Sequence, residues 1–160
     1  MESKQDYEKY QKVNILWLDK YVNEGENIDH QNELKKIKQA KLFPFTNIND
    51  CIIKLKEIEF EKTFIIVSGS LSLDFFKKMK ENINEIKVIP EIIIFTSKSR
   101  SLQIKINSYN ENFILFDNNL IYCEFDHIIQ QIQKKKFMNL KLIKKEITQQ
   151  MKKYLLYLNI

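Results

Sequence analysis

Short apolar segments alternate with helical patterns along this chain, and no other feature of the sequence limits the fold as strongly. The clearest unit is residues 62–76, KTFIIVSGSLSLDFF, in which an apolar, β-branched run stops at Ser68-Gly69-Ser70 and an amphipathic pattern follows. A continuous apolar run of this length indicates a strand buried on both faces, as in parallel sheets. Because the strand and helix patterns alternate, the sequence predicts parallel strands with right-handed helical crossovers, and helices on both faces of one sheet.

The predicted strands are rich in β-branched and aromatic residues, and the predicted helices have apolar residues at helical spacing. Strands are expected at residues 13–18, 40–46, 63–68, 88–97 and 112–116. Helices are expected at residues 27–39, 47–60, 73–86 and 126–135, with a polar helix or an irregular turn at 97–108. The sequence therefore predicts a three-layer α/β domain.

Some single residues refine this prediction. Pro44 suits an edge strand, because proline cannot donate to a strand ladder. Asn47 or Asn49 is expected to cap the second helix. The third helix carries Phe75, Phe76, Met79 and Ile83 at helical spacing, as an apolar face does, and Trp17 is expected to pack in the core or on a face of the sheet.

Length and charge divide the chain into three parts. Its 160 residues, 44% of them hydrophobic, suit a single domain with a full core. Residues 134–160 hold eight lysines and one glutamate, a net charge of +7, whereas the whole chain carries +5, so residues 1–133 carry −2. We expect a polar N-terminal segment (1–12), a domain (13–133) and a basic amphipathic helical tail (134–160).

Cysteine usage and hydropathy point to a soluble protein of the cytoplasm. Cys51 and Cys123 are far apart and lack metal-ligand spacing, so we expect reduced core thiols. The first twelve residues lack the apolar stretch of a signal peptide. No apolar run approaches the roughly 20 residues of a membrane span, so no transmembrane segment is expected.

Four segments, NILWLDKY, FIIVSGS, EIIIFTSK and NFILFDN, resemble in this order the strand ends of response-regulator receiver domains. Receivers typically end these strands in an acidic pair, a phospho-acceptor aspartate, a hydroxyl residue and a lysine. The resemblance covers about residues 13–133. It implies a flavodoxin/receiver-like, five-stranded parallel sheet of order 2-1-3-4-5, here with a C-terminal helical extension.

Residue by residue, the resemblance implies a degenerate phosphorylation site. Asp19 matches one acid of the pair, but Lys20 occupies the other position, and Ser68 replaces the acceptor aspartate. Thr96 matches the hydroxyl residue, whereas Asp117 lies where the lysine is expected. Because Mg²⁺ needs several oxygen ligands and a serine hydroxyl cannot form an acyl phosphate, we expect no catalytic residue, no metal and no cofactor. Asp19 is instead expected to hydrogen-bond Lys20 or nearby amides.

The serines after the third strand have simpler roles open to them. Ser68 and Ser70 would close a turn in which Gly69 supplies a permissive φ, or would cap the next helix. A nucleophilic serine is disfavoured because the G-x-S-x-G pattern is absent and His127 falls on the polar side of its helix. A phosphate loop is disfavoured because VSGSLS has one glycine and no GK[ST] follows. His30 is expected to be a solvated helix residue.

The basic tail combines clustered lysines with an apolar stripe. The stripe consists of Phe137, Leu140, Ile147, Met151, Tyr154 and Leu158. The tail would be either a helix with a solvated basic face or a helix that docks on a protein partner, with a homo-oligomer as a further option. Nucleic acid is not favoured as a partner, because Arg100 is the only arginine and no nucleic-acid-reading motif is found.

The sequence thus favours a non-catalytic module for protein–protein interaction, or a subunit of a larger assembly. The alternative is a small-ligand or phosphate-binding domain, or a residual enzyme, that uses Asp19, Ser68, Ser70 and Thr96 at the strand ends. A weaker alternative is electrostatic binding of nucleic acid or an anionic membrane by the tail.

Overall fold

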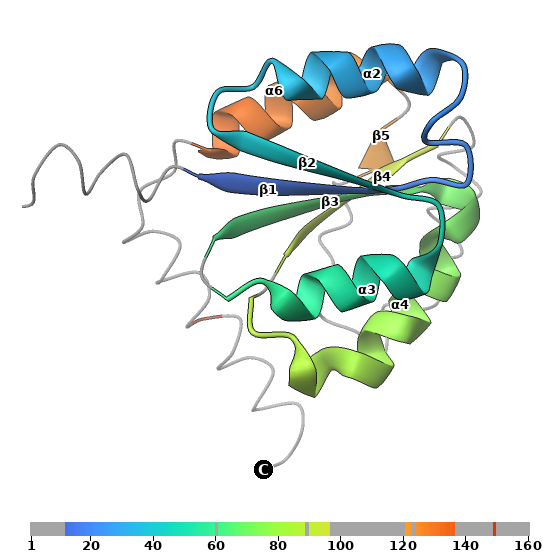
Figure 1. The fold of residues 1–160 in the computed structure, drawn as a ribbon, viewed down its shortest axis with the longest axis vertical. Helices are drawn as coiled ribbons and strands as arrows, with labels where there is room; N and C mark the ends of the chain where they lie inside the picture. Colours follow the sequence, from blue (N-terminus) through green and yellow to red (C-terminus); the bar gives the residue numbers. More distant parts are fainter. Residues whose placement is uncertain are drawn as a thin grey trace, which may run out of the picture.

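The fold is built around a parallel β-sheet. The computed structural model describes residues 12–59, 61–88, 90–96, 121–122 and 124–136, together with Gln149. The strands are β1 (Val13–Leu18), β2 (Ala40–Phe45), β3 (Lys62–Ser68), β4 (Glu91–Phe95) and the two-residue β5 (Ile121–Tyr122). They lie in the order β2-β1-β3-β4-β5, and every pair is parallel (Figure 1). The predicted α/β class and the parallel sheet are confirmed.

Helices cover both faces of this sheet (Figure 1). One face is covered by α2 (Glu26–Lys35) and α6 (Phe125–Lys136). The other face is covered by α3 (Ile48–Glu57) and α4 (Gly69–Asn82), which continues into the short 3₁₀ helix η1 (Ile83–Glu85). The helix expected at residues 126–135 corresponds to α6, so the division expected between residues 133 and 134 falls inside this helix.

The central strands β1 and β3 bury side chains on both of their faces, as their apolar sequences predict. Leu16, Leu18, Ile65 and Val67 pack under α3 and α4. The alternate residues Ile15, Trp17, Phe64 and Ile66 pack under α2 and α6. Fully burying each of these large apolar side chains contributes about 1.5–3 kcal/mol to stability. The core is therefore two apolar layers separated by the sheet.

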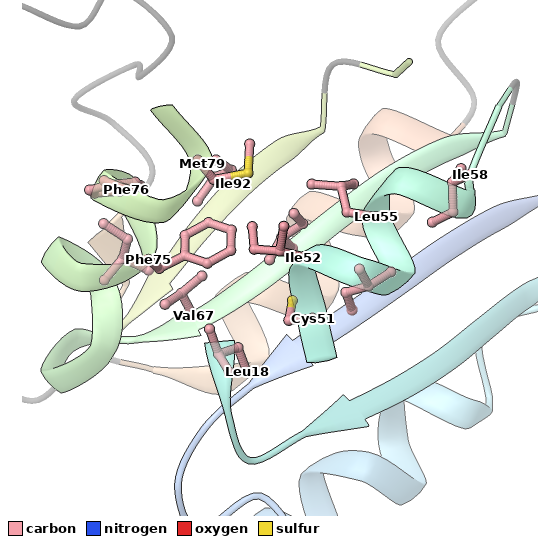
Figure 2. Packing of buried hydrophobic residues seen from close by; sticks show 13 residues of the cluster. Leu18, Cys51, Ile52, Leu55, Ile58, Val67, Phe75, Phe76, Met79 and Ile92 are labelled. Carbon is pink, nitrogen blue, oxygen red and sulfur yellow. The ribbon is translucent and has the colours of Figure 1, made fainter. Parts of the chain in front are cut away.

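Figure 2 shows the layer on the α3/α4 face. Leu55 of α3 and Phe75 and Met79 of α4 lie over the sheet, close to Val67 and Ile92. The apolar face predicted for Phe75, Phe76 and Met79 is confirmed by their burial. Ile83 is only half-buried, because α4 ends at the preceding residue and Ile83 begins η1.

The link between β3 and α4 differs from the prediction. We expected a turn at residues 68–70 in which Gly69 has a permissive φ, but α4 begins at Gly69 itself. Ser68 keeps an extended backbone (φ −64°, ψ 144°) as the N-cap residue, so the strand passes directly into the helix. Gly25 is the one glycine with a positive φ among the described residues.

Helix α2 also ends before the predicted boundary at residue 39. The helix stops at Lys35, and Gln39 adopts a positive φ of 61°. The Gln39 carbonyl accepts a hydrogen bond of 3.1 Å from the Val13 amide. This turn brings Ala40 alongside Val13 at the start of the β1–β2 pair, so the pairing of the strands decides where the helix ends.

The second strand carries Pro44, which is exposed. Among the described strands, β2 pairs only with β1, and Pro44 lies opposite Trp17 in this pair. Its missing amide donor therefore leaves the described hydrogen-bond ladder intact.

Several predictions lie outside the described residues. These are the strand at 112–116, the polar segment at 97–108, Cys123, Asp117 and the tail positions Phe137, Leu140, Ile147, Met151, Tyr154 and Leu158. The strand that pairs with the outer side of β4 is β5, further along the chain than residues 112–116.

Candidate functional site

Three of the predicted site residues lie at the carboxyl ends of adjacent strands. Leu18 of β1 pairs with Val67 of β3, and Ser68 pairs with Phe95 of β4. Asp19 follows Leu18 directly, and Thr96 follows Phe95. Asp19, Ser68 and Thr96 therefore belong to one edge of the sheet, where ligand sites of parallel α/β proteins usually form.

One oxygen of the Asp19 carboxylate accepts a hydrogen bond within the turn that follows β1. Its Oδ1 accepts a hydrogen bond of 2.8 Å from the Tyr21 amide, and its carbonyl accepts one of 3.1 Å from the Val22 amide. The Asp19 amide donates to the Phe45 carbonyl at 3.0 Å. The expected bond to a nearby amide is thus present, and Asp19 closes an Asx-type turn.

Ser68 is almost inaccessible at the N-terminus of α4. The residue is 8% exposed, and its Oγ lies 3.3 Å from Ser70 Oγ. Ser68 occupies the N-cap position, but its side chain makes no capping hydrogen bond, so its expected capping role is wrong. Ser72 Oγ instead donates to the Gly69 carbonyl at 2.8 Å. The hydroxyl of Ser68 is therefore held within the protein rather than presented to solvent.

The other predicted residues are placed as follows. Lys20 is exposed, and Thr96 is half-buried directly after β4. His127 is exposed on α6, as predicted, with Nε2 3.7 Å from Glu124 Oε2. Within the described ranges, no group of three or more His, Cys, Asp or Glu side chains is arranged to hold a metal ion.

The solvated environment predicted for His30 is wrong. The residue is half-buried, and its ring stacks on Phe125 with centroids 4.0 Å apart and an interplanar angle of 14°. Phe95 meets His30 edge-on at 6.0 Å, and Trp17 packs against Phe125 at 5.1 Å. Nothing in the local sequence signals this cluster, because its members come from β1, α2, β4 and α6.

Trp17 is fully buried in this aromatic cluster, as expected for a core residue. Its indole Nε1 has no hydrogen-bond partner within the part of the chain that the structure describes. A buried donor left unpaired costs about 1–3 kcal/mol. The apolar contacts of the buried indole in the core layer under α2 and α6 act against this cost.

Cys51 is a buried thiol on α3. It is 0% exposed in the α3/α4 layer (Figure 2). Burial raises its pKa to about 12, because desolvation disfavours the thiolate. A thiol that stays protonated is a poor nucleophile and a poor metal ligand, so Cys51 serves as an apolar core residue.

A pocket of about 400 Å³ near the strand ends was not predicted from the sequence. It is lined by Lys20 from the turn after β1, by residues 46–49 before and at the start of α3, and by one face of α4. The contributing α4 residues are Leu71, Asp74 and Lys78. Their spacing is helical, but the sequence alone does not indicate which helices face each other.

Comparison with known proteins found no matching family model, no similar curated protein and no similar solved structure. Among the helices that the structure describes, none combines the length and the apolar character needed to cross a membrane.

Proposed function

We propose that this chain is a non-catalytic, receiver-like domain that works in protein–protein interaction or as a subunit of a larger intracellular assembly, without phosphotransfer. In this proposal the domain belongs to the flavodoxin-like class, with five parallel strands in the order 2-1-3-4-5. The partner binds through the basic amphipathic tail.

The observation that carries this proposal is the state of Asp19 and Ser68 at the strand ends. The Asp19 carboxylate accepts a hydrogen bond from the Tyr21 amide at 2.8 Å. Ser68 is 8% exposed, and its hydroxyl contacts that of Ser70. Phosphoryl transfer of the receiver type needs an accessible acceptor carboxylate beside a metal held by carboxylates, and this pair is poorly suited to both roles.

The position at which α6 ends supports the role of the tail. Lys62 Nζ, at the start of β3, donates to the carbonyl of Lys135 at 2.7 Å. Lys135 also forms an ion pair with Glu91, at the start of β4. Helix α6 therefore ends near the amino ends of these strands, at the edge opposite Asp19 and Ser68. A partner held where the tail begins leaves the carboxyl edge of the sheet uncovered.

The absence of phosphotransfer is tested by NMR on the full chain. We expect the amide signals of Asp19, Ser68 and Thr96 to stay unchanged when Mg²⁺ and beryllofluoride are added together. Shifts at these three residues would show that a phosphoryl analogue binds at the strand ends, and the proposal would then be wrong.

The role of the tail is tested with two variants that change the charge equally. One replaces Leu140, Ile147 and Tyr154 of the apolar stripe by Asp, and the control replaces Asn139, Gln149 and Gln150 by Asp. We expect the stripe variant to fail to capture the proteins that the unchanged chain captures from native cells, whereas the control variant still captures them. Circular dichroism should show that both variants are folded. If both variants lose their partners equally, and if high salt causes the same loss in the unchanged protein, electrostatic binding of nucleic acid or of an anionic membrane is favoured instead.

A further inference from the structure

The pocket beside the strand ends gathers hydrogen-bond donors from three separate segments of the chain. Its volume of about 400 Å³ falls in the range of small-molecule sites. We propose that this pocket binds a small organic anion, a phosphate monoester or a carboxylate with an apolar substituent, and that Lys20 is the main charged group that recognises it.

The charges of the pocket point to an anion. Of its three charged side chains, Lys78 lies 3.2 Å from Glu81, and Asp74 lies 3.8 Å from Lys77. Lys20, in contrast, has no ion-pair or hydrogen-bond partner among the described residues. The carboxylate of the pocket is thus already paired, and the ammonium group of Lys20 is the charge that a ligand would neutralise.

Neutral groups of the pocket add to this preference. The Thr46 hydroxyl and the Asn49 amide supply donors, and both residues are exposed. Asn47 is already engaged, because its Oδ1 accepts from the Asp50 amide at 2.9 Å. The first residues of α3, Ile48 and Asn49, line the pocket, so the positive end of the helix dipole lies at its wall.

The apolar part of the lining indicates an organic ligand rather than an inorganic ion. Ile48 and Leu71 line the pocket and are half-buried against the α3/α4 core layer. An inorganic phosphate would leave these side chains in contact with water, whereas an apolar substituent would cover them. Neither Asp19 nor Ser68 lines this pocket, so this inference does not rest on the proposed function.

The test uses NMR titration of the full chain with four probes: phenyl phosphate, benzoate, inorganic phosphate and benzyl alcohol. Amide-resolved signals are needed because the lysines of residues 134–160 attract anions nonspecifically. We expect phenyl phosphate or benzoate to shift the amide signals of Lys20, Asn49 and Leu71, and the tighter of the two assigns the head group. Inorganic phosphate and benzyl alcohol are each expected to bind more weakly.

Two variants complete the test. Lys20→Gln should lower the affinity for the tighter-binding organic anion about fivefold or more, as expected for a lost charge-assisted hydrogen bond. Lys20→Arg should keep most of the affinity. The matched control is Lys36→Gln, an exposed lysine that pairs with Glu33 at the end of α2, and it should have no effect. The proposal is overturned if the pocket signals do not shift, if Lys36→Gln weakens binding as much as Lys20→Gln, or if benzyl alcohol or inorganic phosphate binds as tightly as the organic anions.

Discussion

The imidazole ring of His30 lies flat on the phenyl ring of Phe125, with their centroids 4.0 Å apart. This contact joins α2 to the first turn of α6, two helices that are almost a hundred residues apart in the chain. Trp17 of β1 and Phe95 at the end of β4 pack against the same phenyl ring. Phe125 therefore links both helices of this face to the sheet.

Replacing Phe125 by Ala should lower the free energy of unfolding by about 3–5 kcal/mol, because a buried phenyl ring and its aromatic contacts are lost. Urea unfolding followed by circular dichroism measures this change. His127→Ala is the matched control on the exposed side of α6 and should change stability by less than about 0.5 kcal/mol. Equal effects of the two substitutions would mean that the aromatic cluster does not hold α6.

The turn after β1 gives a second prediction. Asp19→Ala should destabilise the protein by about 0.5–1.5 kcal/mol, because the Tyr21 amide loses its side-chain acceptor. Asp19→Asn keeps an oxygen at the same position and should cost less. Thermal unfolding of the wild type, Asp19→Ala and Asp19→Asn measures these differences in stability.

The same three proteins also distinguish a structural role of Asp19 from a metal-binding role. If Asp19 only closes the turn, millimolar Mg²⁺ leaves the differences in stability unchanged. If Asp19 binds the ion in the folded protein, Mg²⁺ stabilises the wild type selectively by mass action.

Elements with strong local signals were predicted well from the sequence. The apolar run at residues 63–68 lies within β3, and α3 begins at Ile48 with Asn47 as its cap. Asn47 Oδ1 accepts from the Asp50 amide, which is the bond that gives asparagine its preference for this position. Both signals act over a few residues, so no knowledge of the tertiary structure was needed to read them.

Features that depend on distant parts of the chain were not predicted. His30 is flanked by Asp29 and Gln31, a polar context that indicates solvent, yet it meets Phe125 across the helix pair. The pocket likewise joins Lys20 to α3 and α4, whose mutual orientation depends on core packing. For the site at the strand ends, the sequence predicted which residues belong to it but not how they lie relative to one another. The register of the β1–β3 pair, which brings Asp19 next to Ser68, depends on how the strands pair.

The glycine before α2 gives a third prediction. Gly25 has φ 53° and ψ −136°, a region that residues with a Cβ atom rarely adopt. A Cβ atom there would meet no other atom within 4 Å, so the cost of Gly25→Ala is backbone strain alone, about 1–3 kcal/mol. Glu24→Ala, at the exposed neighbouring position, is the control, and equilibrium unfolding in urea measures both. If Gly25→Ala leaves the free energy of unfolding unchanged, the turn can relax to another backbone conformation.

The buried thiol of Cys51 makes stability depend on alkaline pH. Its pKa is raised to about 12 in the folded protein, above the ordinary value of 9.0, so above pH 9.0 the unfolded chain binds fewer protons than the folded one. By linkage, stability then falls as pH rises, by about 1.4 kcal/mol from this group at pH 10. Well below pH 9.0 the thiol is protonated in both states and contributes almost no slope.

Lysines and tyrosines also titrate at alkaline pH, so the contribution of Cys51 must be isolated by difference. Cys51→Ala lowers stability at every pH because it removes buried volume, but it lacks this one titration. The gap in unfolding free energy between wild type and Cys51→Ala should therefore narrow between pH 8 and pH 10 by about 1.4 kcal/mol. A gap that stays constant would mean that the thiol ionises as readily in the folded core as in water, which is incompatible with the burial of Cys51 between α3 and the sheet.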